Sequence, residues 1–300
     1  MRLRYFTCDV FTDTRFGGNQ LAVLPEAEGL SDAQMLQIAR EFNYSETTFV
    51  LPPRRGHDRR VRIFTPGGEV PFAGHPNVGT AFVLATMGAF GPLAEPREVV
   101  FEEEAGLVPV AIRRRPHGRI WCELTAPQRL TLGAAVPVAS VAAAASLAEA
   151  DIVITAHAPI VASVGLAFVM AELTGREALA RARPDLAVFE ALAAGGLEEP
   201  MLHLYVRSGD EFDIRARMFS PLDGIPEDAA TGSANCALAG LLAHLDEATD
   251  ADSSWRIAQG VEMGRPSVLE ARVEKQHGSV ERVRIGGESV LVCEGVIDVG

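Results

Sequence analysis

Two stretches of small residues are placed where each could open a helix with its backbone amides exposed to a ligand. One contains Ala73 and Gly74, and the other contains Gly232 and Ala234. The first four N–H groups of a helix lack partners within the helix, and the positive end of the helix dipole attracts anions. Small residues let a ligand approach this backbone closely. Two such helix starts facing each other would make a pocket for a small carboxylate.

Three titratable side chains accompany these stretches, namely Glu46, His75 and Asp228. Each also has a purely structural interpretation. Glu46 opens a strand in NYSETTFV and could simply be exposed, whereas His75 could cap its own helix. Asp228 or the neighbouring Glu227 could likewise cap the helix that follows. The residues alone leave the catalytic and the structural interpretations open.

The elements that must position these groups are two buried helices. Apolar residues occur on every side of the predicted helices from Pro76 to Met87 and from about Ala234 to Leu245. A helix of this kind lies inside a core rather than on a surface. A third helix is predicted to begin after Ser31, because Gln34 completes a capping box.

An internal repeat links the two buried helices. RIFTPGGEVPFAGHPNVGTAFVL begins at Arg62, and RMFSPLDGIPEDAATGSANCALAGL begins at Arg217. Gly74-His75 corresponds to Gly232-Ser233 if the second copy carries three extra residues. The repeat predicts two pseudo-equivalent halves with a site between them.

Strands are predicted around both helices, and an Ala-rich change in composition near Ala126-Pro127 marks a domain boundary. We therefore expect one domain at 1–126 plus about 288–300, and a second at 127–287. The predicted strands are Arg4–Val10, Leu21–Leu24, Ser45–Leu51, Val61–Thr65, Glu98–Phe101, Leu107–Arg113, Ile120–Leu124, Ile152–Thr155, Ala167–Leu173, Met201–Arg207, Ile214–Phe219, Ser267–Val273, Val280–Ile285 and Val290–Val296.

Composition narrows the class of protein. The 300 residues carry a net charge of −13, which argues against binding to nucleic acid or to an anionic membrane. Apolar residues make up 48%, as in globular chains. No signal peptide or membrane span is visible, so a cytoplasmic protein is expected. Four cysteines without CxxC spacing are predicted to be buried, reduced thiols: Cys8, Cys122, Cys236 and Cys293.

Five motifs, taken together, resemble the phenazine biosynthesis PhzF-like family. They are FGGNQLAV, NYSETTFV, IFTPGGEVPFAGHPNVGTAFVL, EDAATGSA and QGVEMGRPS. They cover nearly the whole chain in the order of the family. The resemblance implies the α+β fold of diaminopimelate epimerase, with two similar domains, each a β-barrel-like sheet wrapped around a central helix. It also implies a homodimer.

The resemblance further implies cofactor-free proton transfer, without a metal, in a cleft where both helix starts converge. The namesake activity isomerises trans-2,3-dihydro-3-hydroxyanthranilate. Glu46 matches the catalytic glutamate of the family, and His75, Asp228 and Ser233 match its substrate-contacting and proton-handling set. Gly74 and Gly232 match positions that present backbone amides to the substrate. Asn19 is assigned to substrate binding on the same basis.

The sequence also departs from its relatives. Thiol-dependent epimerases place a cysteine before each small-residue turn, where this chain has Ala73 and Ala230. Cys236 lies inside the predicted helix and is interpreted as structural, so a two-thiol racemase is disfavoured. Gln20 follows Asn19 where the family usually has proline. The role of Arg265 in QGVEMGRPS does not follow from the sequence.

We therefore predict an isomerase that shifts a proton on a small carboxylate-bearing substrate, with Glu46 as the base. One alternative is an amino-acid epimerase or racemase that uses Glu46 and Asp228 as opposed acid and base. Another is a non-catalytic small-molecule binding protein on the same scaffold, which would not need Glu46. Fold alone does not decide among these functions.

Overall fold

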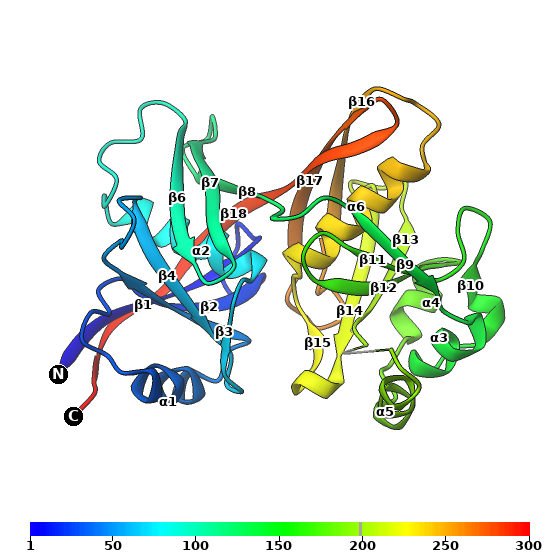
Figure 1. Cartoon of the computed structure of the whole chain (residues 1–300), viewed down its shortest axis with the longest axis horizontal. Helices are drawn as coiled ribbons and strands as arrows, with labels where there is room; N and C mark the ends of the chain where they lie inside the picture. Colours follow the sequence, from blue (N-terminus) through cyan, green and yellow to red (C-terminus); the bar gives the residue numbers. More distant parts are fainter. Residues whose placement is uncertain (198–199) are drawn as a thin grey trace. The chain divides into compact units, whose positions relative to one another are not determined.

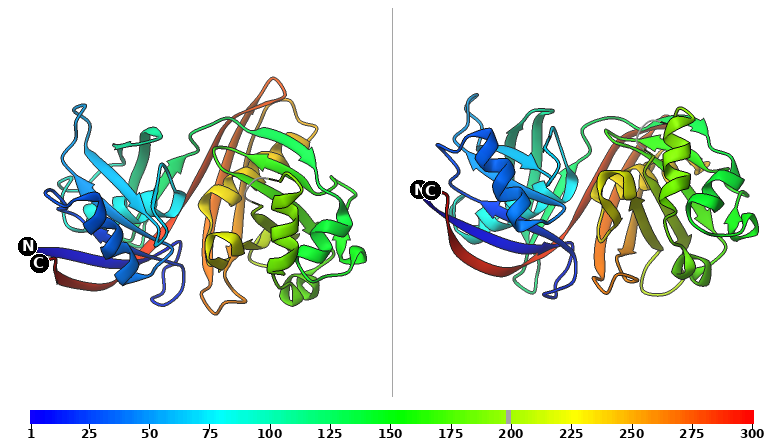
Figure 2. Two further views of the ribbon diagram at one scale, coloured as in Figure 1. Left: turned by 60° about the horizontal axis from the view of Figure 1, so that its bottom comes forward. Right: turned by 90° about the horizontal axis from the view of Figure 1, so that it is seen from below.

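The computed structural model describes residues 1–197 and 200–300, and the chain divides into two compact units (Figure 1). Unit 1 comprises Met1–Thr125 and Gly286–Gly300, and unit 2 comprises Ala126–Ile285. The two chain ends lie side by side in unit 1 in every view, and the Met1 amino group donates to the Gly300 carbonyl at 3.1 Å (Figures 1 and 2).

The strands of unit 1 form a closed ring. The elements are β1 Arg2–Val10, β2 Asn19–Leu24, α1 Asp32–Phe42, β3 Glu46–Leu51, β4 Arg59–Phe64, β5 Glu69–Val70, α2 Gly74–Thr86, β6 Arg97–Glu103, β7 Gly106–Arg114, β8 Ile120–Thr125 and the C-terminal part of β18 Ser279–Asp298. Hydrogen-bonded neighbours follow the order β1, β2, β3, β4, β6, β7, β8 and β18, and β18 returns to β1. The ring leaves the helix that it surrounds shielded from water.

Helix α2 fills the interior of this ring. Its residues from Gly74 to Ala85 are all buried. Gly79 faces the sheet so closely that a Cβ there would lie 2.5 Å from a methyl group of Leu21 and 2.7 Å from one of Val10. Because Gly79 admits no side chain, the helix packs directly against β1 and β2.

Helix α1 lies outside the ring. Ser31 caps it with the predicted capping box, since its hydroxyl accepts from the Gln34 N–H and the Gln34 side chain accepts from the Ser31 N–H. Met35, Ile38 and Ala39 pack into a cluster with apolar side chains of β2, β3 and β4. The predicted start of this helix is confirmed.

Unit 2 is built in the same way around α6. Its elements are β9 Thr131–Ala135, α3 Val138–Ala144, β10 Ile152–Val153, β11 Ile160–Ser163, β12 Ala167–Leu173, α4 Arg176–Arg181, α5 Leu186–Ala194, β13 Leu202–Arg207, β14 Ile214–Ser220, β15 Ile225–Asp228, α6 Gly232–Leu245, β16 Ala251–Gln259, β17 Ser267–Gln276 and the first part of β18. Figure 1 shows α6 running along the strands of this unit. Its residues from Ala234 to Ala243 are all buried.

The pairing of the strands repeats from one unit to the other. In unit 1, β2 and β3 are parallel, β3 and β4 antiparallel, β4 and β6 parallel, and β6 and β7 antiparallel. In unit 2, the same sequence of pairings joins β12, β13, β14, β16 and β17. The internal repeat and the predicted fold class, two pseudo-equivalent barrel-like sheets around buried helices, are thereby confirmed.

Several features differ from the sequence-based expectations. Strands β5, β9, β11, β15 and β16 were not predicted. In β16, exposed polar residues alternate with half-buried ones until the last three positions, so the strand lacks a continuous apolar run. The two strands predicted at Val280–Ile285 and Val290–Val296 are one continuous strand, β18, which runs through Gly286. The Ala-rich stretch that follows Ala126-Pro127 contains helix α3, which packs in a core of unit 2 with α4 and α5.

The expectation of four buried thiols is wrong for one cysteine. Cys8, Cys122 and Cys236 are buried, whereas Cys293 is exposed. Cys293 of β18 pairs with Thr7 of β1, next to a bulge in this pairing. Across the described residues, we find no helix with the length and apolar character needed to cross a membrane.

Candidate active site

The first turn of α2 presents an uncapped backbone. Its N-cap residue is Ala73, which has an extended conformation and provides no side-chain hydrogen bond to the helix. Gly74 and His75 are the first two helical residues. The N–H groups of such a turn point along the helix axis toward whatever lies before it. The exposed helix start expected from the sequence is therefore present, and anion binding there stays a prediction.

Three predicted site residues of unit 1 lie next to one another at this helix start. Asn19 begins β2, Glu46 begins β3, and these strands run parallel with Glu46 opposite Leu21. Asn19 Nδ2 lies 3.3 Å from His75 Nδ1, and His75 Nε2 lies 3.5 Å from Glu46 Oε2. The side chains of His75 and Glu46 are only 5% and 16% exposed. Glu46 is therefore not the exposed carboxylate of the structural interpretation.

The order of these contacts assigns the histidine tautomer. The amide nitrogen of Asn19 can only donate, so His75 Nδ1 is the acceptor and Nε2 carries the proton. That Nε2–H then faces the Glu46 carboxylate. The site thus combines a carboxylate, an oriented imidazole and uncapped backbone amides. Groups of these kinds can transfer a proton on a substrate whose anionic group is bound by the amides.

The first turn of α6 carries the second set, in unit 2. Asp228 ends β15, is 7% exposed and accepts a hydrogen bond at 2.6 Å from the hydroxyl of Thr231. Thr231 is the N-cap residue, and its side chain does not cap the helix. Gly232 and Ser233 follow as the first helical residues. The structure thus places all three predicted residues of this half within six positions of one another at a helix start.

Glu227, the other candidate for a helix cap, has a different task. Both its carboxylate oxygens accept from the Arg217 guanidinium, at 2.8 and 2.7 Å. Arg217 is 3% exposed and also donates to the carbonyl groups of Leu179 and Ala182. Glu227 and Arg217 therefore hold β14, β15 and the end of α4 together.

The strand register shows that each unit carries one carboxylate without a counterpart in the other. Val70 and Asp228 pair with the equivalent residues Ile63 and Met218, so Val70 occupies the position of Asp228. By the same register, the residue of unit 2 that corresponds to Glu46 is Met201. Glu46 and Asp228 thus each occur in one unit only, and their roles as acid and base toward one substrate stay a prediction.

The two helix starts also show which residues stand where thiol-dependent epimerases have their cysteines. Asn77 Nδ2 donates to the Ala73 carbonyl and Asn235 Nδ2 to the Thr231 carbonyl, each at 2.9 Å. The residue equivalent to Ala73 is therefore Thr231, not Ala230 as the sequence suggested. Neither place holds a cysteine, and Cys236 is buried in the second turn of α6. Burial also raises the pKa of the Cys8 and Cys122 thiols, which disfavours their thiolate forms.

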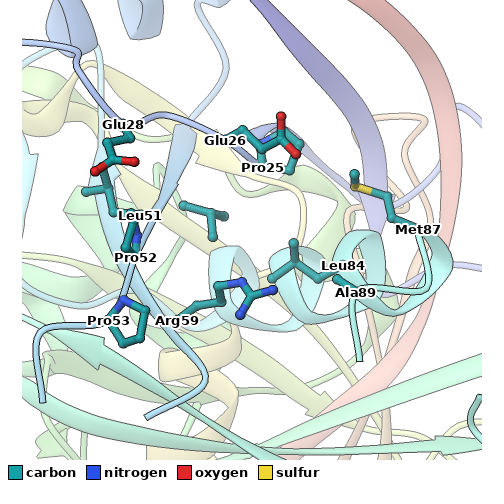
Figure 3. A pocket seen from close by; sticks show the side chains of 11 residues that line it. Pro25, Glu26, Glu28, Leu51, Pro52, Pro53, Arg59, Leu84, Met87 and Ala89 are labelled. Atoms are coloured by element: carbon teal, nitrogen blue, oxygen red, sulfur yellow. The ribbon is translucent and has the colours of Figure 1, made fainter. Parts of the chain in front are cut away.

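A pocket of about 370 Å³ in unit 1 lies elsewhere (Figure 3). Leu84 and Met87, at the C-terminal end of α2, line it together with Pro25, Leu51 and Arg59. Because His75 is at the opposite end of the helix, this pocket is not the predicted site. Among the described residues, no group of three or more His, Cys, Asp or Glu side chains could hold a metal ion.

Sequence reasoning missed two residues at the start of α6, Thr231 and Gln259. Gln259 is the first residue of QGVEMGRPS, and it is completely buried although it is polar. A signal was available, because Gln259 ends the apolar run Ile257-Ala258 where another apolar residue would be expected. Arg265 of the same motif donates its backbone N–H to the Gly260 carbonyl at 3.0 Å.

Comparison with known proteins identifies the family of the chain. The family model described as "Phenazine biosynthesis-like protein" matches residues 8–295. An uncharacterized isomerase, mll1393, of Mesorhizobium japonicum is 38% identical, with 97% of each chain covered. The trans-2,3-dihydro-3-hydroxyanthranilate isomerase of Pseudomonas fluorescens is 34% identical, with 98% of each chain covered. The structure of a Bacillus anthracis PhzF-family protein matches with a TM-score of 0.90 at 24% identity, covering 99% of each chain, which concerns the fold alone.

A barrel-like sheet around each of two buried helices, with an acidic group at each helix start, defines a protein of the diaminopimelate epimerase-like fold. Within that class, the chain belongs to the phenazine biosynthesis-like (PhzF) family. It is an isomerase, as its curated relatives are.

Proposed function

We propose that this isomerase moves a proton between carbons of a small carboxylate-bearing substrate, without a cofactor, as in the isomerisation of trans-2,3-dihydro-3-hydroxyanthranilate. The single observation that supports this most strongly is the contact series Asn19–His75–Glu46 at the uncapped start of α2. A relative at 34% identity over nearly the full chain carries that named activity.

The proposed reaction balances within the substrate. The Glu46 carboxylate removes a proton from carbon, and the electron pair of the broken C–H bond enters the neighbouring π system. The proton then returns to a different carbon, so the composition of the substrate does not change. Backbone amides at the start of α2 hold the substrate carboxylate and stabilise the developing negative charge. His75, oriented by Asn19, keeps Glu46 in position through its Nε2–H.

Replacement of Glu46 by glutamine tests this proposal. Glutamine preserves the shape of the side chain but cannot accept the proton, so we expect turnover to fall by about 100- to 10,000-fold. The measurement is the incorporation of solvent deuterium into trans-2,3-dihydro-3-hydroxyanthranilate and its product, followed by NMR. Glu26→Gln, at an exposed carboxylate of the same unit, is the matched control and should retain full activity.

The same experiment separates the alternatives. Undiminished deuterium exchange in Glu46→Gln would remove Glu46 from the role of base. Deuterium that enters the α-carbon of an amino acid with inversion, and not the dihydroaromatic substrate, would make the protein an epimerase. Tight binding of the substrate by the wild type without any exchange would make it a binding protein.

A further inference from the structure

Gln259 is the hub of a buried hydrogen-bond network at the start of α6. Its Oε1 accepts from the Thr231 backbone N–H at 3.1 Å and from Asn235 Nδ2 at 2.7 Å. Its Nε2 donates to the Asp228 carbonyl at 2.8 Å and to Thr231 Oγ1 at 3.0 Å. The amide is thus engaged through both ends and cannot rotate without losing these bonds.

This network fixes the direction of the Thr231 hydroxyl. Because Gln259 Nε2 donates to Thr231 Oγ1, the single hydroxyl proton of Thr231 remains for Asp228 Oδ2, which lies 2.6 Å away. Gln259 therefore orients Asp228 twice, once through its backbone carbonyl and once through Thr231. A side chain held in this way loses little freedom when a ligand binds.

The loop that follows Gln259 reinforces the same turn. Gly260 has φ +73°, and a Cβ there would lie 2.5 Å from the carbonyl oxygens of Ala229 and Arg265, so only glycine fits. The Ser267 hydroxyl lies within hydrogen-bonding distance of both carbonyls, at 2.9 and 3.2 Å. The QGVEMGRPS stretch, residues 259–267, thus holds the turn between Asp228 and α6 in place. We call this stretch the clasp.

The strand register identifies the residue of unit 1 that takes the place of Gln259. Residues Arg60 and Arg215 are equivalent in the repeat, and they pair with Glu102 and Ala258 in parallel ladders. One position further along, Glu103 ends β6 and Gln259 ends β16. Glu103 is therefore the pseudo-equivalent of Gln259, as Asn77 is of Asn235.

Glu103 matches an amide only in its protonated form. It is 6% exposed, and neither of its carboxyl oxygens has a hydrogen bond of normal geometry among the described residues. Glu103 interacts with the side chain of Asn77 in the first turn of α2, and Asn77 Oδ1 is also buried without a partner among the described residues. A protonated carboxyl can donate to such an oxygen, whereas a carboxylate cannot. Burial raises the pKa of Glu103 to about 8, and Asn77 partly opposes this shift.

We propose that Gln259 and Glu103 are pseudo-equivalent positioning residues, each holding the first turn of its buried helix through the asparagine of that turn. The inference deepens the proposed function, because it rests on those helix starts being where the substrate binds. Its consequence is that Glu103 holds α2 as a neutral group and loses that contact when it ionises.

Other ionisable side chains lie near Glu103 and near Gln259. Around Glu103, a cavity of about 500 Å³ is lined by Arg54, Arg55, Arg60, Arg62, Glu69, Glu102 and Glu104. Around Gln259, the ionisable neighbours are Asp228 and, beside Asn235, His203, whose pKa burial lowers to about 4. His203 therefore stays neutral above pH 5 and does not change charge in the range over which Glu103 ionises.

The test exchanges the two residues between the halves. Glu103→Gln should keep kcat at pH 7 within about threefold and move the alkaline limb of the kcat profile, expected near pH 8, to higher pH. Gln259→Glu should lower kcat at pH 7.5 by at least about tenfold with KM changed less than about threefold, and should recover activity toward pH 6 as the new carboxyl becomes protonated.

A control variant separates positioning from general stability. Lys275→Met removes a buried group at the opposite end of α6, where Lys275 Nζ donates to the carbonyls of Ala243 and Asp246. It should lower the melting temperature and leave the kcat profile unchanged. If Gln259→Glu does not fold, Thr231→Val cuts the link between Gln259 and Asp228 and should produce the same loss of kcat.

An alkaline limb that stays in place in Glu103→Gln would overturn the assignment of Glu103, and wild-type kcat at every pH in Gln259→Glu would overturn that of Gln259. A readout independent of turnover keeps the proposed function separate. The side-chain NH2 resonances of Asn77 should titrate near pH 8 in the wild type and not in Glu103→Gln. Those of Asn235 should titrate only in Gln259→Glu. If both titrations are observed but the protein does not turn over the substrate, the proposed substrate is wrong and the positioning role stands. If the titrations are absent, the positioning role is wrong.

Discussion

At the scale of single residues, the decisive groups are polar side chains placed where a core residue would be expected. Glu103, His203 and Gln259 are all buried, and each approaches an asparagine in the first turn of a central helix. Removing a polar group from water is costly unless a partner replaces the lost hydration. At these positions a polar side chain lowers the stability of the core and, in return, orients the first turn of a helix.

Glu103 should make stability fall as pH rises. Its pKa is 4.5 in the unfolded chain and about 8 in the folded protein, so between these values the folded state holds a proton that the unfolded state has released. This proton disfavours folding by about 1.4 kcal/mol for each unit of rising pH in that window. Glu103→Gln should remove this slope, so its advantage over the wild type should grow from pH 5 to pH 8.

The measurement is a series of urea unfolding curves at pH 5, 6, 7 and 8. Glu104→Gln, at the exposed next residue, is the matched control and should keep the wild-type slope. Parallel pH profiles for the wild type and Glu103→Gln would show that Glu103 is ionised in the folded protein.

At the scale of elements, helix α6 is held at its two ends by different means. The start of α6 is clasped by Gln259, and its end is held by Lys275, which is 5% exposed and donates to two terminal carbonyls at 3.0 and 2.7 Å. A cation at this end is favoured by the helix dipole. Together, Gln259 and Lys275 fix α6 in place although no side chain caps its first turn.

Lys275→Met should lower the free energy of unfolding by about 1–3 kcal/mol, because a buried carbonyl oxygen loses its donor. The measurement is chemical unfolding of the purified protein, with Arg272→Met, an exposed position of the same strand, as the control. Equal stability of Lys275→Met and the wild type would mean that water replaces the ammonium group at the helix end.

The elements that the sequence predicted correctly are those with a local cause. The capping box at Ser31 and the apolar surfaces of α2 and α6 depend on neighbours within one helix, and they were found. The contact between Asn19, His75 and Glu46 depends on the parallel pairing of β2 and β3, which no local pattern specifies. The clasp by Gln259 was missed for the same reason, since its partners lie 24 to 31 positions away along the chain.

At the scale of the whole molecule, one strand belongs to both units. Unit 1 is completed by Gly286–Gly300, which follows unit 2 along the chain and supplies the part of β18 between β8 and β1. Gly286 lies against Trp121 so closely that a Cβ would lie 2.5 Å from its ring. Closing the ring of unit 1 therefore joins segments that the whole of unit 2 separates along the chain, which makes closure a long-range event in folding.

Truncation after Ile285 should consequently disrupt unit 1 more than unit 2. Each unit contains one tryptophan, Trp121 in unit 1 and Trp255 in unit 2, so fluorescence can report on them separately. In a Trp255→Phe background, truncation should shift the emission of Trp121 to the red, because this ring, 1% exposed in the full chain, loses its β18 neighbour. In a Trp121→Phe background, the emission of Trp255 should change little. An unshifted Trp121 spectrum would mean that the ring closes without β18, whereas equal shifts of both would mean that the units fold as one.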